Sequence, residues 1–110
     1  MSVEEQAVEL AAWAEESGIG LSELARVSGL SREAIRVLAE SGLIEARPAG
    51  HYSWRFTARG VSRARTAGRL RTDFGLNQSG LLLALTLIDR IEQLERRLRA
   101  MECQLPRRAP

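Results

Sequence analysis

Apolar residues recur every three or four positions along most of this chain, which predicts a mainly α-helical fold. The first such stretch begins after Ser2, whose spacing to Glu5 matches a capping box. It should end near Gly18, because glycine is the usual left-handed terminator of a helix. These features predict an N-terminal helix whose outer face carries glutamates.

Two shorter helices are predicted next, over residues 21–27 and 31–38. Ala25 is small where these helices must approach, and Gly29 supplies the positive φ of the tight turn between them. Ser31 is the expected N-cap of the second helix. The spacing is typical of a helix-turn-helix, and a plain helical hairpin is the alternative.

The pattern then changes to alternating apolar and polar residues, which predicts a two-stranded wing. Its strands are expected over 43–45 and 51–56, with a turn over 47–50. Three aromatic residues would share one face of the second strand: Tyr52, Trp54 and Phe56. Packing into the core is the default for this face, and an aromatic anchor for a partner is the alternative.

Two longer helices follow the wing. Thr57 should open the first, which carries arginines on its solvent sides and ends at Gly75. Asn77 should cap the second, which can continue to about Gln104. The predicted fold is therefore a winged helix-turn-helix with a long C-terminal dimerisation helix. Its parts are the N-terminal helix and winged domain over 1–76, the long helix over 77–105 and a flexible tail over 106–110.

The last helix carries an apolar seam with the register of a coiled coil. Spacings of four and three residues alternate along it: Leu87, Ile91, Leu94, Leu98, Met101 and Leu105. In a parallel homodimer, Arg90 and Arg97 would face Glu95 and Glu102 of the second copy. An antiparallel pair and a helix folded back on its own domain are the alternatives. The apolar residues at the start of the helix should pack on the body: Leu81, Leu82, Leu83, Leu85 and Ile88.

Charge changes this picture more than composition does. All 16 basic residues are arginine, and the formal net charge of +2 conceals an uneven distribution. Residues 1–45 hold nine glutamates against three arginines, whereas residues 46–72 hold seven arginines and no acid. Residues 73–110 are nearly balanced, with six basic and five acidic side chains. This asymmetry indicates a polyanion or a charged protein surface as the partner.

The chain resembles the MerR family of transcription regulators in the order of its elements and in several motifs. These motifs are Leu24-Ala25, Gly29-Leu30-Ser31, Ile35-Arg36, Glu40-Ser41-Gly42-Leu43-Ile44, Arg47-Pro48 and Phe74-Gly75-Leu76. A narrower resemblance, from Leu21 to about Leu94, is to the CbpM-type chaperone-modulator family. It rests on Arg69-Leu70-Arg71 and on Leu81 to Ile91, with Ala84-Leu85-Thr86-Leu87-Ile88-Asp89.

The narrower resemblance implies a small cytoplasmic protein that binds the J-domain of a DnaJ-like co-chaperone. Binding would block the work of that co-chaperone with the Hsp70 DnaK, and its DNA binding. A J-domain presents a basic helix, so an acidic surface made of Glu23, Glu33 and Glu40 is the candidate docking site.

A MerR-like DNA-binding transcriptional regulator is the alternative function. Arg32 and Arg36 would then reach the major groove, and the wing would follow the phosphate backbone. The wing residues assigned to this role are Arg47, Tyr52 and Arg55. An arginine-rich surface that is merely solvated explains the same residues without a ligand.

The sequence gives little support for a catalytic site or a metal site. His51 is the only histidine and Cys103 the only cysteine, and neither is near a second ligand or a nucleophile–base pair. We therefore expect no enzyme activity, cofactor or metal. The unpaired thiol also indicates a reducing compartment, the cytoplasm. The longest apolar run, residues 80–87, is far shorter than the roughly 20 residues that span a bilayer.

Overall fold

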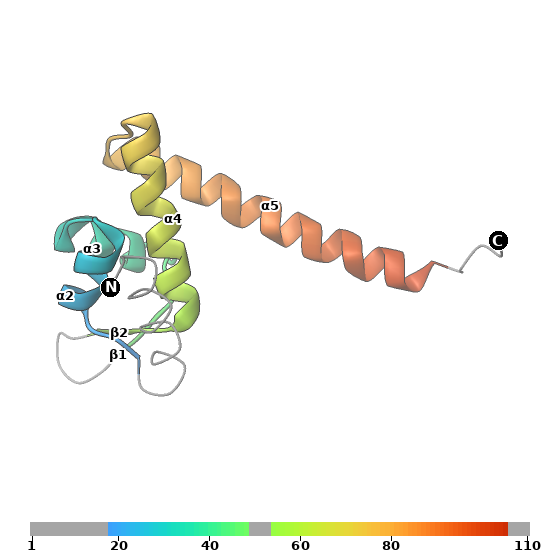
Figure 1. The fold of residues 1–110 in the computed structure, drawn as a ribbon. Coiled ribbons are helices and arrows are strands. Elements are labelled where there is room, and N and C mark those ends of the chain that lie inside the picture. The colour runs from blue at the N-terminus through green and yellow to red at the C-terminus, as the bar shows by residue number, and fades with distance from the viewer. Residues whose placement is uncertain (1–17, 49–53, 106–110) are drawn as a thin grey trace.

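The computed structural model describes residues 18–48 and 54–105. A small body holds the first four elements and α4, and a long helix projects from it (Figure 1). The elements in chain order are α2 (Leu21–Ser28), α3 (Arg32–Glu40), β1 (Ala46–Pro48), β2 (Trp54–Phe56), α4 (Ala58–Phe74) and α5 (Gln78–Gln104). The N-terminal helix, the wing tip with Tyr52 and the C-terminal tail of the sequence analysis lie outside the described residues.

The helix-turn-helix prediction is confirmed by α2, α3 and the turn between them. Gly29 follows α2 with a φ of 76°, and its N–H donates to the carbonyl of Ala25 over 3.0 Å. Ser31 caps α3, because its hydroxyl accepts a hydrogen bond from the Ala34 N–H over 3.0 Å. Both boundaries depend on contacts within four residues, which explains why the local sequence predicts them.

The wing is present, but its first strand lies later in the chain than predicted. β1 begins at Ala46, not at Leu43, and it pairs antiparallel with β2 so that Ala46 faces Phe56. Leu43 and Ile44 instead donate their N–H groups to the carbonyl of Leu38, over 2.9 and 3.3 Å, and so close the end of α3. Ile44 also enters the core, which removes this segment from the strand ladder.

A third backbone segment extends this small sheet on the other side of β2. Ile19 and Phe56 exchange two hydrogen bonds, of 3.1 Å from the Ile19 N–H and 2.8 Å from the Phe56 N–H. Both side chains are fully buried. Trp54 is half-buried and meets the Phe56 ring edge-on at 6.2 Å. The aromatic face of β2 therefore packs inward at Phe56, as the default interpretation predicted.

α4 packs against α2, β2 and α5 and presents small residues to its neighbours. Thr57 caps it by accepting from the Gly60 N–H over 3.2 Å. A Cβ on Gly68 would overlap the carbonyl oxygen of Ser28 at the end of α2, and one on Gly60 would overlap that of Glu45. Glycine is therefore required at both positions for the close approach of α4 to its neighbours.

The core joins every element of the body and the first turns of α5. Its fully buried apolar side chains include Ile19, Leu24, Ile35, Leu38, Phe56, Val61, Leu81 and Leu85. Leu82 and Ile88 pack at its edge. Leu83 does not, because 61% of it is exposed, and the prediction that it packs on the body is wrong. On a helix, Leu83 lies about 160° from Leu85 and therefore faces away from the body.

The distal part of α5 leaves the body, and no side chain from Arg96 to Leu105 is buried (Figure 1). The five central seam residues are between 47% and 63% exposed: Leu87, Ile91, Leu94, Leu98 and Met101. The alternative in which this helix folds back on its own domain is therefore wrong. No helix among residues 18–48 and 54–105 is long and apolar enough to cross a membrane.

Candidate partner-binding surfaces

The outward face of α3 carries both acidic and basic side chains. Ala34, Ile35 and Leu38 turn one side of the helix into the core. The opposite side exposes four charged residues: Arg32, Glu33, Arg36 and Glu40. The formal charge of this face is zero, because its two arginines balance its two glutamates. In the alternative function α3 would enter a DNA groove. Its exposed face would then bring two carboxylates toward the DNA.

Two of the predicted acidic residues, Glu23 and Glu33, lie in the first turns of α2 and α3, and the third, Glu40, is the last residue of α3. Arg32 donates from Nη2 to the hydroxyl oxygen of Ser22 over 2.6 Å, which joins the start of α3 to the first turn of α2. Glu23 follows Ser22 and is exposed. Glu33 and Glu40 are seven residues apart on one face of α3, about 10.5 Å along its axis. The three glutamates therefore border the exposed side of the helix-turn-helix.

The wing brings together the two described arginines that the sequence analysis assigned to DNA. Arg47 and Arg55 are direct partners across the β1–β2 pair, and both are exposed. Like charges directly opposite each other on a ribbon repel, so the pair favours an anion beside it. Tyr52, the third wing residue of that assignment, lies outside the described residues.

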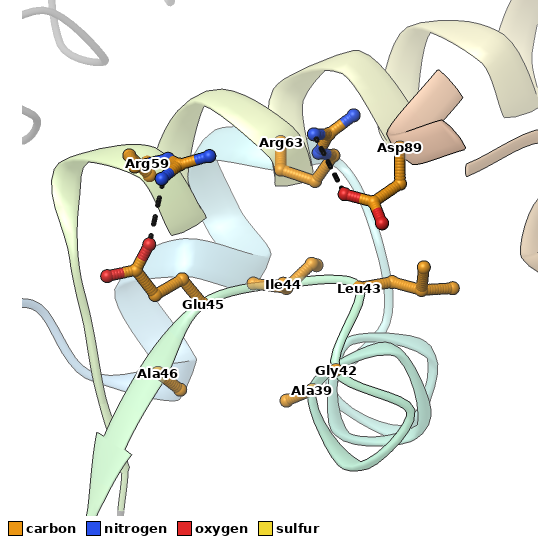
Figure 2. Close-up of a pocket in the computed structure, with 9 residues that line it drawn as sticks. All are labelled: Ala39, Gly42, Leu43, Ile44, Glu45, Ala46, Arg59, Arg63 and Asp89. Atoms are coloured by element: carbon orange, nitrogen blue, oxygen red, sulfur yellow. Dashed lines mark ion pairs between the residues drawn. The ribbon is translucent and has the colours of Figure 1, made fainter. Parts of the chain in front are cut away.

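A surface depression of about 330 Å³ lies between the α3–β1 turn, α4 and α5. Figure 2 shows Arg59 and Arg63 of α4 along one side of it, with Glu45 and Asp89 toward its two ends. Arg63 is only 15% exposed and donates to Glu92 of α5 over 2.6 Å. Sequence reasoning missed this site, because Arg63 and Glu92 are 29 positions apart and no local pattern relates them.

The apolar seam of α5 lies on a different face of the helix from the one that contacts the body. Leu81 and Leu85 are fully buried. The seam residues point in a different direction around the helix axis, away from the face that holds these two leucines. Leu83, 61% exposed, extends this stripe toward the body, and Leu105, 67% exposed, extends it toward the C-terminus. Phe74, the last residue of α4, is also exposed, at 70%.

The part of the chain that the structure describes contains no cluster of side chains suited to metal binding or redox chemistry. Those residues contain no group of three or more His, Cys, Asp or Glu side chains placed to hold a metal ion. Cys103 is exposed on α5, outside the seam register. His51 lies outside the described residues.

Comparisons with known proteins agree on one family. Residues 19–103 match the family described as MerR HTH family regulatory protein. A protein of Coxiella burnetii named chaperone modulatory protein CbpM is 37% identical over 86 residues, which cover 78% of this chain and 81% of that protein. A protein of the same name from Escherichia coli is 29% identical over 87 residues, covering 79% of this chain and 86% of that protein.

Proposed function

Since this chain belongs to the MerR helix-turn-helix family and, within it, to the CbpM-type chaperone modulators, we propose that it binds the J-domain of a DnaJ-like co-chaperone. It acts in the cytoplasm as a binding protein without catalytic activity. By covering the basic helix of the J-domain, it prevents that helix from docking on Hsp70, and it also suppresses the DNA binding of the co-chaperone.

The exposed face of α3 is the observation that carries this proposal. Glu33 and Glu40 are two helical turns apart on α3. Lysines or arginines that are two turns apart on a partner helix would match the spacing of these two carboxylates. A basic helix lying along α3 can therefore meet both carboxylates. A phosphate backbone in the same place would meet these carboxylates as well as Arg32 and Arg36, so this face lacks the positive charge that attracts DNA.

Homodimerisation is the second part of the proposal. A stripe of apolar side chains about half exposed extends over the projecting part of α5, centred on Leu94. A second copy is the occupant that matches its coiled-coil register. Arg90 and Arg97 on one side of the seam and Glu95 and Glu102 on the other favour a parallel pair over an antiparallel one. Each dimer then presents two helix-turn-helix faces.

Titration calorimetry with a purified J-domain tests the main proposal. The wild-type chain should bind the J-domain and suppress its stimulation of Hsp70 ATPase activity. Reversing Glu33 and Glu40 to arginine should abolish binding, because the basic helix then meets four arginines on α3. The control reverses the exposed Asp73, which lies outside α3 and outside the seam of α5, and it is compared with each single reversal on α3. Unchanged affinity in the α3 variant would exclude this face, and no binding by the wild-type chain would exclude the function.

DNA binding is the second candidate function, and the cross-strand pair Arg47 and Arg55 is the observation that favours it. Two exposed guanidinium groups side by side suit a phosphate backbone. A salt titration of binding to duplex DNA measures this contribution. Five phosphate contacts per dimer predict a log–log slope of about −4.5, and a slope near zero excludes binding through the backbone.

A further inference from the structure

The depression between the α3–β1 turn, α4 and α5 continues along α4. A second hollow of about 310 Å³ is lined by Ser62, Thr66, Ile88 and Glu92, and it shares Arg59 and Arg63 with the first. The two hollows share these two arginines, and we call the two together the α4 groove. Ala39 lines its first hollow, and the next residue is Glu40, so the groove lies beside the end of α3 that carries Glu40.

The carboxylates of the α4 groove differ in how tightly the arginines hold them. Arg63 Nη2 lies 2.6 Å from Glu92 Oε2, a short hydrogen bond. The same nitrogen is 4.0 Å from Asp89 Oδ1, and Arg59 Nε is 3.7 Å from Glu45 Oε2. These two separations exceed hydrogen-bond length. Glu45 and Asp89, each about half exposed, therefore retain the capacity to accept a hydrogen bond from a cation brought by a partner.

The floor of the α4 groove suits the aliphatic part of a long basic side chain. Leu43 and Ile88 are half-buried at the edge of the core, and Ala39 and Ala46 add small apolar surfaces. Lysine and arginine bury their methylene stems on such surfaces while their charged ends reach a carboxylate. Three acidic groups against two arginines leave the groove with a formal charge of −1. The balance thus favours a basic occupant over an acidic one.

We propose that the α4 groove receives basic side chains from the helix of the J-domain that this protein binds, with Glu45 and Asp89 as the accepting carboxylates. This proposal rests on the proposed function and extends its docking surface from α3 across the α3–β1 turn to α5. The concave groove anchors the partner, and the convex face of α3 supplies the remaining charge.

Charge-neutralising variants test the groove by its charge. Glu45→Gln with Asp89→Asn should weaken J-domain binding on the order of tenfold, because two charge-assisted hydrogen bonds are lost. Asn at position 89 can still accept the 2.8 Å hydrogen bond from Gln93 Nε2. Asp73→Asn, the control for either groove substitution alone, removes one charge from an exposed site outside the groove and should leave the affinity within about twofold. Thermal unfolding checks that every variant folds.

A pair of variants tests the groove by its shape. Thr66 and Thr86 each donate a hydroxyl hydrogen bond to the carbonyl four residues earlier, but only Thr66 lines the groove. Thr66→Arg should therefore reduce J-domain affinity, while Thr86→Arg should not.

The outcomes separate this inference from the proposed function. Wild-type binding with no difference between the groove variants and their controls would overturn the groove while leaving the function intact. A change in dimer mass at unchanged affinity would also overturn it, since the groove would then contact a second copy. No binding of the J-domain by the wild-type chain would overturn both.

Discussion

The body and the projecting part of α5 differ in whether their apolar side chains are buried. In the body, Leu24, Ile35 and Phe56 are fully buried, and glycines allow backbones to touch. Along α5 beyond Glu92, Leu94, Leu98 and Met101 remain about half exposed. The body therefore satisfies its apolar surface within one chain, whereas the projecting helix carries an apolar stripe that only another molecule can cover.

This difference leads us to expect that separate parts of the molecule govern stability and association. Leu81 and Leu85 attach α5 to the core, and the ion pair of Arg63 with Glu92 marks the outer limit of that attachment. Substitutions in the body should therefore change unfolding, and those in the distal helix should change association. Four variants test this division, in order of decreasing effect.

Leu94→Arg should have the largest effect. Placing arginine at the centre of the seam removes two buried leucines per dimer and costs on the order of 5 kcal/mol of association. We expect a monomeric mass in sedimentation with unchanged far-ultraviolet circular dichroism of the body. Ala100→Arg, which is exposed and outside the seam, is the control and should remain dimeric. A Leu94→Arg protein with the same mass as the wild type would contradict the seam assignment.

Gly68→Ala should be the most destabilising change within the body. Its Cβ would overlap the Ser28 carbonyl, so α2 and α4 must separate, at a cost of about 3 kcal/mol. Urea unfolding measures the loss. Gly20→Ala is the control, because nothing lies within 4 Å of its Cβ and its φ of −83° suits any residue. Equal stability of the two variants would show that the helices do not meet as described.

Arg63→Met should have an intermediate effect at the junction of the two regions. It leaves Glu92 without its 2.6 Å partner in a partly buried site, which costs about 1–2 kcal/mol. The loss should appear in urea unfolding and should diminish at high salt. A variant as stable as the wild type would remove this ion pair as a fixing point of α5.

Arg59→Met should have the smallest effect. Its contact with Glu45 is 3.7 Å long, and the two side chains are 71% and 52% exposed, so its contribution is about 0–0.5 kcal/mol. Differential scanning calorimetry of Arg59→Met beside Arg63→Met makes the comparison directly. A loss for Arg59→Met as large as that for Arg63→Met would mean that burial does not distinguish the two ion pairs.

Much of the fold was predictable because its boundaries depend on close neighbours. Ser31, Thr57 and Asn77 each accept a hydrogen bond from an N–H three residues later, which a local motif reveals. The register of the α5 seam follows from helical periodicity in the same way. Glu33 and Glu40 were chosen for their charge, because the resemblance implied a basic partner helix, and the structure places both on the exposed face of α3.

Contacts between distant segments could not be predicted. Leu43 and Ile44 have the apolar character of a strand, yet they close α3 and enter the core, since the carbonyl of Leu38 is within reach. The residues next to Leu83 in the sequence are buried or half-buried. Leu83 itself is exposed because of the direction in which α5 packs against the body. The α4 groove combines three segments of the chain, so no single stretch of sequence marks it.

The sequence by itself determined the helices, their caps, the turn at Gly29, the spacing of the apolar stripe on α5 and the division of charge, because these depend on residues a few positions apart. Only the tertiary structure decided which face of α5 contacts the body, where β1 begins and that Glu45 and Asp89 border one depression. Those outcomes depend on how closely helices approach one another, and that approach depends on small residues such as Gly68 opposite a backbone 40 positions away.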